Sequence, residues 1–196
     1  MKAGKYIAFI LVLVLISCEP DPKEYQTLDP STKDYFDVKN QSEYIFSEIS
    51  DSFNEIKYVT DNYINTHANP DIENNEIISY DLIATGFPKL TIRCESGGLQ
   101  YKDRVALLTT KNDSVIIGPI VFNLGAQFSV GFNSGDSVFQ LPMWSVMNRN
   151  FSDVVRIKPK NNLLYSEIYY ARNIGLIARK EKNGKFYYLK RYQINR

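Results

Sequence analysis

The sequence predicts an all-β protein, mainly antiparallel, with about ten short strands in a curved sheet, a partly open barrel or a sandwich. Three observations support this fold class. Apolar and polar residues alternate over short stretches along most of the chain, and clusters of Gly, Pro, Asn, Asp and Ser separate these stretches. The pair Asn183-Gly184 lies between two strand-like runs and is typical of a hairpin turn. With 44% hydrophobic and 13% aromatic residues, the chain has enough apolar surface to build a core.

The first segment, residues 1–17, is predicted to be a secretory signal peptide. It has a basic start at Lys2 and Lys5 and an apolar run to Ile16, which is too short to span a bilayer. Its last residues, Leu-Ile-Ser before Cys18, resemble a bacterial lipobox. The resemblance implies cleavage before Cys18 and acylation of that cysteine. The alternative is an ordinary signal peptide in which Cys18 is incidental.

Residues 18–33 are predicted to be the acylated cysteine and a flexible tether, because the stretch is rich in Pro, Asp and Thr. Residues 34–196 are predicted to form one β-rich domain. That length suits a single core.

The stretch from Ser42 to Asn65 fits two predictions. Its apolar residues match a helical stripe, but its composition of Ser, Asn, Asp, Tyr and Ile is typical of strands and turns. We favour a hairpin, with strands over 43–49 and 55–63 and a turn at 51–54.

The remaining strands are separated by turn residues. Gly86-Phe87-Pro88 and 111–113 are expected turns, and 141–147, which contains the only tryptophan, is expected to be an apolar loop. Gly175 is expected at a bend or a close backbone approach. A type I′ turn is expected at 183–184. The expected strands are 76–85, 89–95, 104–110, 114–122, 137–141, 153–158, 166–180 and 186–195.

Three segments resemble uncharacterised lipoproteins of Bacteroidetes-type bacteria. They are DYFDVK followed by SEYIF at 34–46, VVRI followed by IYYARNIGLI at 154–177, and NG followed by FYYLKRY at 183–192. The resemblance implies strands in the first segment and no particular activity. This chain has Glu43-Tyr44-Ile45 where those proteins usually have an aromatic pair with Trp. Glu19 and Asp21 resemble the short acidic tag that sends such lipoproteins to the cell surface.

The charge is balanced overall but uneven along the chain, with 23 basic and 22 acidic residues. The near-neutral total gives no reason to expect nucleic-acid binding. From residue 154 onward there are eleven Lys or Arg and two Asp or Glu; residues 19–153 have ten basic and twenty acidic residues. Either the two parts lie side by side and compensate each other, or the C-terminal third presents a basic face to anionic lipids or glycans.

No catalytic constellation, cofactor motif or metal site is predicted. If Cys18 is acylated, Cys94 has no disulfide partner, and its alternation with Leu90 and Ile92 predicts a small buried residue. His67 is the only histidine and is expected in a loop. A single histidine is not enough for a His-based metal site. The acidic stretch 71–76 lacks the spacing of an EF-hand, so we expect a solvated loop.

The leading functional hypothesis is a non-catalytic lipoprotein of the outer membrane, on its periplasmic or cell-surface face, that binds a partner protein or a glycan. The expected contact surface comprises Trp144, Tyr165, Tyr169 and Tyr187. The alternative is a carrier that holds a lipid or another hydrophobic ligand in the concave face of a curved sheet. The apolar run from Val115 to Phe132 discriminates between them, depending on whether it is core or lines a cavity.

Overall fold

The computed structural model describes residues 27–67, 75–96, 103–111, 114–124, 137–160, 162 and 164–196. For residues 52, 67, 104, 109–111 and 114–124 only the backbone is described. The described elements are a short helix and strands in the following order: α2 (Pro30–Phe36), β1 (Glu43–Glu48), β2 (Asp51–His67), β3 (Glu76–Ile83), β4 (Lys89–Glu95), β5 (Asp103–Lys111), β6 (Ser114–Leu124), β7 (Ser137–Val146), β8 (Arg149–Lys158), β9 (Tyr165–Ala171), β10 (Gly175–Glu181) and β11 (Phe186–Gln193).

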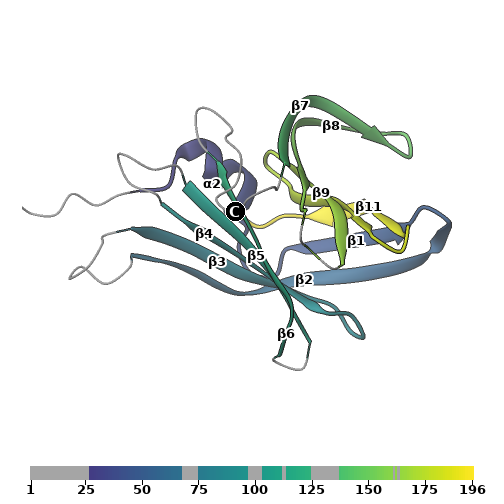
Figure 1. Ribbon diagram of the computed structural model, residues 1–196, viewed down its shortest axis with the longest axis horizontal. Helices are drawn as coiled ribbons and strands as arrows, with labels where there is room; N and C mark the ends of the chain where they lie inside the picture. The colour runs from purple at the N-terminus through teal and green to yellow at the C-terminus, as the bar shows by residue number, and fades with distance from the viewer. Residues whose placement is uncertain are drawn as a thin grey trace, which may run out of the picture.

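All the strands belong to one antiparallel sheet, in the order β6-β5-β4-β3-β2-β1-β11-β10-β9-β8-β7. The sheet is strongly curled (Figure 1), and α2 contacts β9 through Phe36 and Tyr170 and, through Lys33 and Glu76, the half formed by β2 to β6. The pairing of β1 with β11 joins this half to the half formed by β7 to β11. The prediction of an all-β, curved antiparallel fold is confirmed, as a single curled sheet rather than a sandwich.

The hairpin predicted over residues 42–65 is present as β1 and β2. Its turn lies at Ile49-Ser50, and β2 begins at Asp51, earlier than expected. The register shifts between Ser47 and Glu48, so residues 52–54 form an irregularity in the ladder. The backbone N–H groups of Phe53 and Asn54 both point to the Asp51 carboxylate, 3.2 and 3.3 Å away. The residues predicted to form the turn therefore form a bulge next to it.

The single strand expected over 166–180 is wrong, because the chain turns at Arg172-Asn173-Ile174 and forms two paired strands, β9 and β10. Asn173 has a φ of 63° and Gly175 a φ of 94°, which places both in the left-handed region. A Cβ on Gly175 would lie 2.9 Å from Tyr44 Oη. The close approach expected at Gly175 is therefore observed.

The hairpin between β10 and β11 is present, but its turn is not type I′. Gly184 has a φ of 93°, whereas Asn183 is not among the residues with a positive φ. Glu181 N–H donates to the Lys185 carbonyl at 2.8 Å, and Gly184 N–H donates to the Glu181 carbonyl at 3.1 Å. This is the three-residue loop that ends in a left-handed glycine.

The apolar loop expected at 141–147 is also wrong. β7 continues from Ser137 through Pro142 and Trp144 to Val146 and pairs with β8 on both sides of Pro142. Pro142 itself is not among the paired residues, and Asp153, which lies across from it, has a φ of 48°, so the ladder is irregular at this point.

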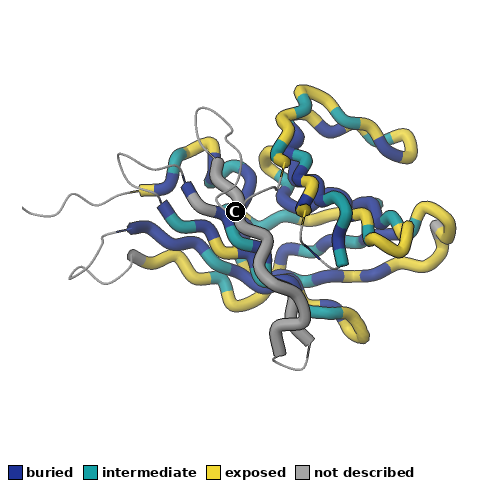
Figure 2. The backbone as a smooth tube through the Cα atoms, in the orientation of Figure 1, coloured by how far each residue is buried: buried dark blue, intermediate teal, exposed yellow. Residues whose placement is uncertain are grey.

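One part of the core lies between the curled sheet and α2, and in β9 and β10 consecutive residues are buried, so both faces of these strands are covered (Figure 2). Phe36 of α2 packs on Tyr170 with ring centroids 4.9 Å apart. Leu28, only 2% exposed, belongs to this core and donates its N–H to Glu76 at 2.9 Å. The expected boundary at residue 34 is therefore too late, because Leu28 and the residues of α2 are part of the folded domain.

Candidate functional site

The strand β7 is the most unusual element of the described sheet. It forms one edge, and only Val146 of its ten residues is buried. It contains no charged residue. Edge strands of monomeric proteins are usually protected by charges, bulges or proline, and β7 has Pro142 alone. An exposed and weakly protected edge is a candidate interaction site.

The β7–β8 hairpin ends in a tight two-residue turn. Met147 and Asn148 have φ values of 45° and 65°, and the flanking residues Val146 and Arg149 are paired. Two consecutive positive φ values define the type I′ turn. Methionine is a poor residue for the first position, which explains why the sequence did not indicate a turn there.

An aromatic cluster fixes this hairpin onto β9 and β11. Trp144 stacks on Tyr169 with ring centroids 4.4 Å apart and an interplanar angle of 22°. Phe186 packs edge-on against both, at 6.3 Å from Trp144 and 6.2 Å from Tyr169. Arg149 adds a polar contact, because its Nη1 donates to the carbonyls of Leu189 and Lys190. The hairpin is thus held in a defined position.

Below the cluster, Arg156 and Glu167 form a two-point ion pair with Nη2–Oε1 and Nε–Oε2 distances of 2.8 and 3.2 Å. Tyr169 also donates its hydroxyl hydrogen to Glu167. Burial acts to raise the pKa of Glu167, but the hydrogen bonds from Arg156 and Tyr169 outweigh it and lower this pKa. Burial and the bond to Glu167 both raise the pKa of Tyr169. Glu167 stays charged and neutralises Arg156.

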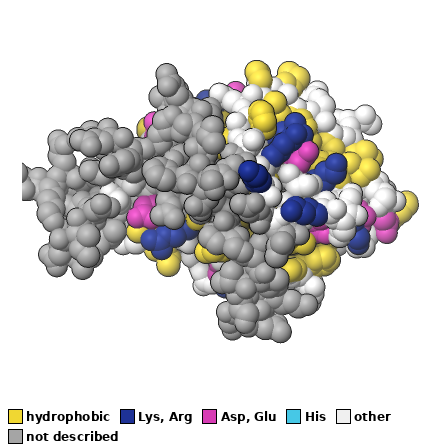
Figure 3. Space-filling view, viewed as in Figure 1, with side chains coloured by type: hydrophobic (Ala, Val, Ile, Leu, Met, Phe, Trp, Pro, Cys, Tyr) yellow, Lys and Arg dark blue, Asp and Glu magenta, His cyan; other side chains and the backbone are white. Residues whose placement is uncertain are grey.

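The exposed side of the hairpin is apolar and carries a positive charge at one end. Met143 is 67% and Phe139 44% exposed. Arg156 Cζ and Lys158 Nζ lie 6.0 and 5.8 Å from the Phe139 ring centroid. Lys158 has no ion-pair partner among the described residues. Figure 3 shows hydrophobic side chains interspersed with Lys and Arg over this end of the molecule.

The four residues expected to form a contact surface are buried or half-buried. Tyr165, Tyr169 and Tyr187 are 2%, 5% and 7% exposed, and Trp144 is half-buried in the aromatic cluster. They pack the sheet and do not form an exposed tyrosine surface. Sequence reasoning missed Phe139 and Met143, although the uncharged run of residues 137–146 was a usable signal.

A second feature is the buried Arg179, which is 4% exposed. Its Nη1 donates to Tyr58 Oη at 2.9 Å, and its Cζ lies 4.9 Å from the Tyr187 ring centroid and 5.1 Å from that of Tyr58. Its Nε has no hydrogen-bond partner among the described residues. Aromatic faces compensate part of the buried charge. This arrangement holds β10 and β11 against β2.

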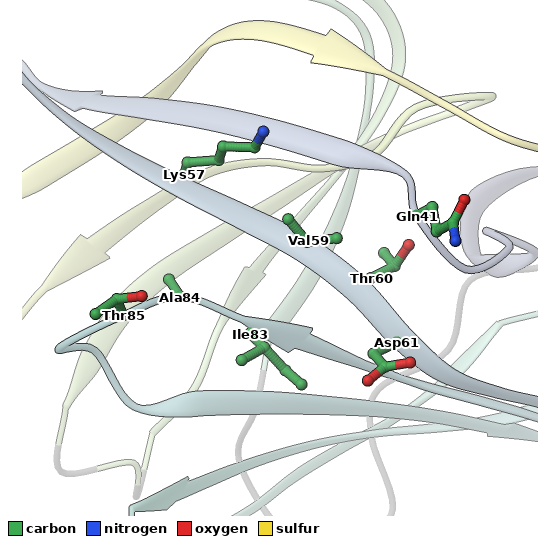
Figure 4. Close-up of a pocket in the computed structure, with 8 residues that line it drawn as sticks. All are labelled: Gln41, Lys57, Val59, Thr60, Asp61, Ile83, Ala84 and Thr85. Carbon is green, nitrogen blue, oxygen red and sulfur yellow. The ribbon is translucent and has the colours of Figure 1, made fainter.

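An open pocket of about 480 Å³ lies where β3 ends and the chain turns away from β2 (Figure 4). Lys57, Val59 and Asp61 of β2 line it together with Ile83 of β3. Lys57 Nζ is 2.5 Å from Glu43 Oε1, so the cation of the pocket is already paired. The lining contains no aromatic side chain. The remaining lining residues are Gln41, Thr60, Ala84 and Thr85.

Other chemistry is sparse in the described part of the chain. His67 is not in a loop as expected but is the last residue of β2, paired with Glu76. Burial raises the pKa of the Cys94 thiol, which is fully buried as expected. No group of three or more His, Cys, Asp or Glu residues that could hold a metal ion occurs in this part. Among the same residues, no helix combines the length and apolarity required to cross a bilayer.

Two further expectations lie wholly or partly outside the described residues. Cys18 and most of the acidic stretch 71–76 lie outside them; Glu76 accepts from Leu28 N–H and pairs with Lys33 at 2.7 Å. Of the run Val115 to Phe132, only the backbone up to Leu124 is described, in β6.

The chain matches no family model, and neither a curated protein nor a solved structure is significantly similar to it.

Proposed function

We propose that this protein is a lipid-anchored, non-catalytic module of the outer membrane that binds a partner protein through its β7–β8 hairpin. The observation that carries the proposal is the exposed apolar edge of β7, with Phe139 and Met143 in solvent next to the cation Lys158. The anchor is Cys18, through the resemblance of residues 15–18 to a lipobox.

A protein partner fits this surface better than a glycan does. Sugar rings stack on exposed aromatic faces, but Trp144 is stacked on Tyr169 and most tyrosines of the described sheet are buried. Exposed Phe and Met beside a cation are instead typical of protein interfaces. The carrier alternative is less favoured because α2 packs into the core, with Phe36 against Tyr170.

The first described residues lie away from the hairpin in strand order. Leu28 and Asp29 donate their N–H groups to Glu76 of β3 and Asp103 of β5. These strands lie in the opposite half of the sheet from β7 and β8.

The test is site-specific photocrosslinking in intact cells with a photoreactive residue at position 143. A matched probe at Phe87, which is exposed on the β3–β4 turn, serves as the control. We expect one envelope protein to crosslink at 143 and not at 87. The purified partner should then bind the wild-type protein and lose affinity for Met143→Asp. Equal crosslinking at both positions, or unchanged affinity of the variant, would contradict the proposal.

A further inference from the structure

The free side of β7 offers backbone groups as well as apolar side chains. In an antiparallel pair, alternate residues of a strand direct their N–H and C=O groups away from the neighbour. β7 has ten residues and pairs on one side with β8 in the described sheet, so about five residues face outward with both groups unless they are proline. Pro142 removes at most one donor. Such a row of groups is a template for another strand.

We infer that β7 binds its partner by strand addition: an extended segment of the partner protein pairs with the free edge of β7 and continues the sheet. This inference rests on the proposed function and specifies how it is performed. The unpaired backbone determines that the occupant is an extended chain, because a helix has no free backbone groups to offer along its length.

The side chains around β7 define the composition of that segment. Phe139 and Met143 of β7 are exposed, whereas Val138, Leu141 and Trp144 pack against the core. An added strand therefore places alternate apolar side chains next to Phe139 and Met143 on the sheet surface. Lys158 lies opposite Ser137, at the beginning of β7, and has no ion-pair partner among the described residues. The segment therefore carries an acidic residue at the end that reaches Ser137.

The β7–β8 hairpin is preorganised for binding a strand. The aromatic cluster and the bonds from Arg149 to β11 hold the hairpin in place, so little ordering is needed when a strand is added. An edge that is exposed, uncharged and held in place is suited to binding a strand, whereas an edge that is only poorly protected need not be held in place.

The probe is a synthetic peptide of alternating Val and Thr that carries Asp at one end, and its binding to the full-length protein in detergent is measured by fluorescence anisotropy. The matched control peptide has the same sequence with N-methyl groups on alternate backbone nitrogens. If the peptide pairs with β7, losing two or more backbone hydrogen bonds weakens binding at least about tenfold.

Three protein variants locate the site. Met143→Asp on β7 and Met147→Asp in the turn change the same residue type and the net charge equally, and both methionines are exposed. We expect Met143→Asp to abolish binding and Met147→Asp to leave it within about threefold. Lys158→Ala should weaken binding of the peptide that carries Asp. It should leave unchanged the binding of a peptide in which Asn replaces this Asp.

Equal affinity of the methylated and unmethylated peptides, or absence of peptide binding, overturns strand addition. If the crosslinked partner still binds at position 143 in that case, the proposed function stands and only its mode is wrong. Dimerisation of the wild-type protein in sedimentation experiments that is lost in Met143→Asp would identify the occupant as a second copy, which also overturns the inference.

Discussion

Gly175 connects two distant parts of the chain at the residue scale. Gly175 is the first residue of β10 and has a φ of 94°. The space that a Cβ would need is taken by Tyr44 Oη. That hydroxyl donates to the Ile174 carbonyl at 2.7 Å. Tyr44 is 1% exposed, so its hydroxyl has few other acceptors. The glycine therefore serves both the turn and the seam between β1 and the β9–β10 hairpin.

We predict that Gly175→Ala lowers the free energy of unfolding by about 2–3 kcal/mol, from positive-φ strain and the displaced hydrogen bond. Gly184→Ala is the control, because Gly184 has a φ of 93° and nothing within 4 Å of the added Cβ; about 1 kcal/mol is expected. In a Tyr44→Phe background, Gly175→Ala should lower the free energy of unfolding by less. Urea unfolding checks all three values, and equal costs at 175 and 184 would contradict the role given to Tyr44.

Arg179 shows a different situation, because its charge is buried and its Nη1 donates a hydrogen bond to Tyr58. Buried charges are expensive to desolvate, and removing a partner costs more than removing the whole pair.

Accordingly, Tyr58→Phe should destabilise the protein by about 1–3 kcal/mol, because it leaves the guanidinium with fewer partners. Arg179→Met, which keeps the volume and removes the charge, should change stability by less than about 1.5 kcal/mol. Adding Tyr58→Phe to Arg179→Met should then cost little. A double-mutant cycle by chemical denaturation measures the coupling, and additive effects would show that the two residues act independently.

At the element scale, α2 is attached through a carboxylate. Glu76 of β3 accepts the Leu28 N–H at 2.9 Å and pairs with Lys33 at 2.7 Å. Burial acts to raise the pKa of Glu76, but the bonds from Lys33 and Leu28 outweigh it, so the pKa is lowered. A short helix of seven residues depends on such docking, because it is too short to be stable alone.

The lowered pKa gives α2 a pH-dependent attachment. An unfolded Glu titrates near about 4.3, so the stabilisation by the Glu76 carboxylate is complete above that pH and is lost as pH falls through the lower folded-state pKa. We predict that wild type is more stable than Glu76→Gln at pH 7 and that the difference shrinks in acid. Urea unfolding of both proteins between pH 7 and pH 3 measures it. A constant difference would refute the charge contribution.

At the scale of the whole molecule, the uneven charge of the sequence is compensated in space. Glu55 of β2 contacts both Lys190 and Arg191 of β11, with Nζ–Oε1 and Nη2–Oε2 distances of 2.7 and 2.5 Å. Asp34 pairs with Arg172 at 2.6 Å. Basic residues of the C-terminal third thus meet acids of the N-terminal part, as one of the two interpretations of the charge pattern requires. These ion pairs weaken the other interpretation, in which the C-terminal third presents a basic face to anionic lipids or glycans.

The proposed anchor is also a property of the whole molecule. We predict that cells grown with labelled palmitate label this protein and that Cys18→Ser abolishes the label and its outer-membrane fractionation. Cys94→Ala is the matched control and should keep both, because Cys94 is buried in the core. Label that persists in Cys18→Ser would show that the resemblance to a lipobox is misleading.

Much of the fold was predictable because strands carry a strong local signal. Leu90, Ile92 and Cys94 alternate with polar residues, and β4 has the predicted bounds. The failures have physical causes. The break at Gly175 depends on Tyr44, more than a hundred residues away, as the bond from Tyr44 to Ile174 shows. The burial of Tyr165, Tyr169 and Tyr187 depends on which strands become neighbours.

The sequence by itself determined the all-β class, the positions of most strands and the expectation of an export signal, since alternation, turn residues and a basic-apolar leader are local properties. Only the tertiary structure decided that β7 is an edge, that its uncharged residues face solvent and that Arg179 is buried among aromatic rings. Exposure and pairing depend on strand order, and strand order is set by contacts between residues far apart along the chain.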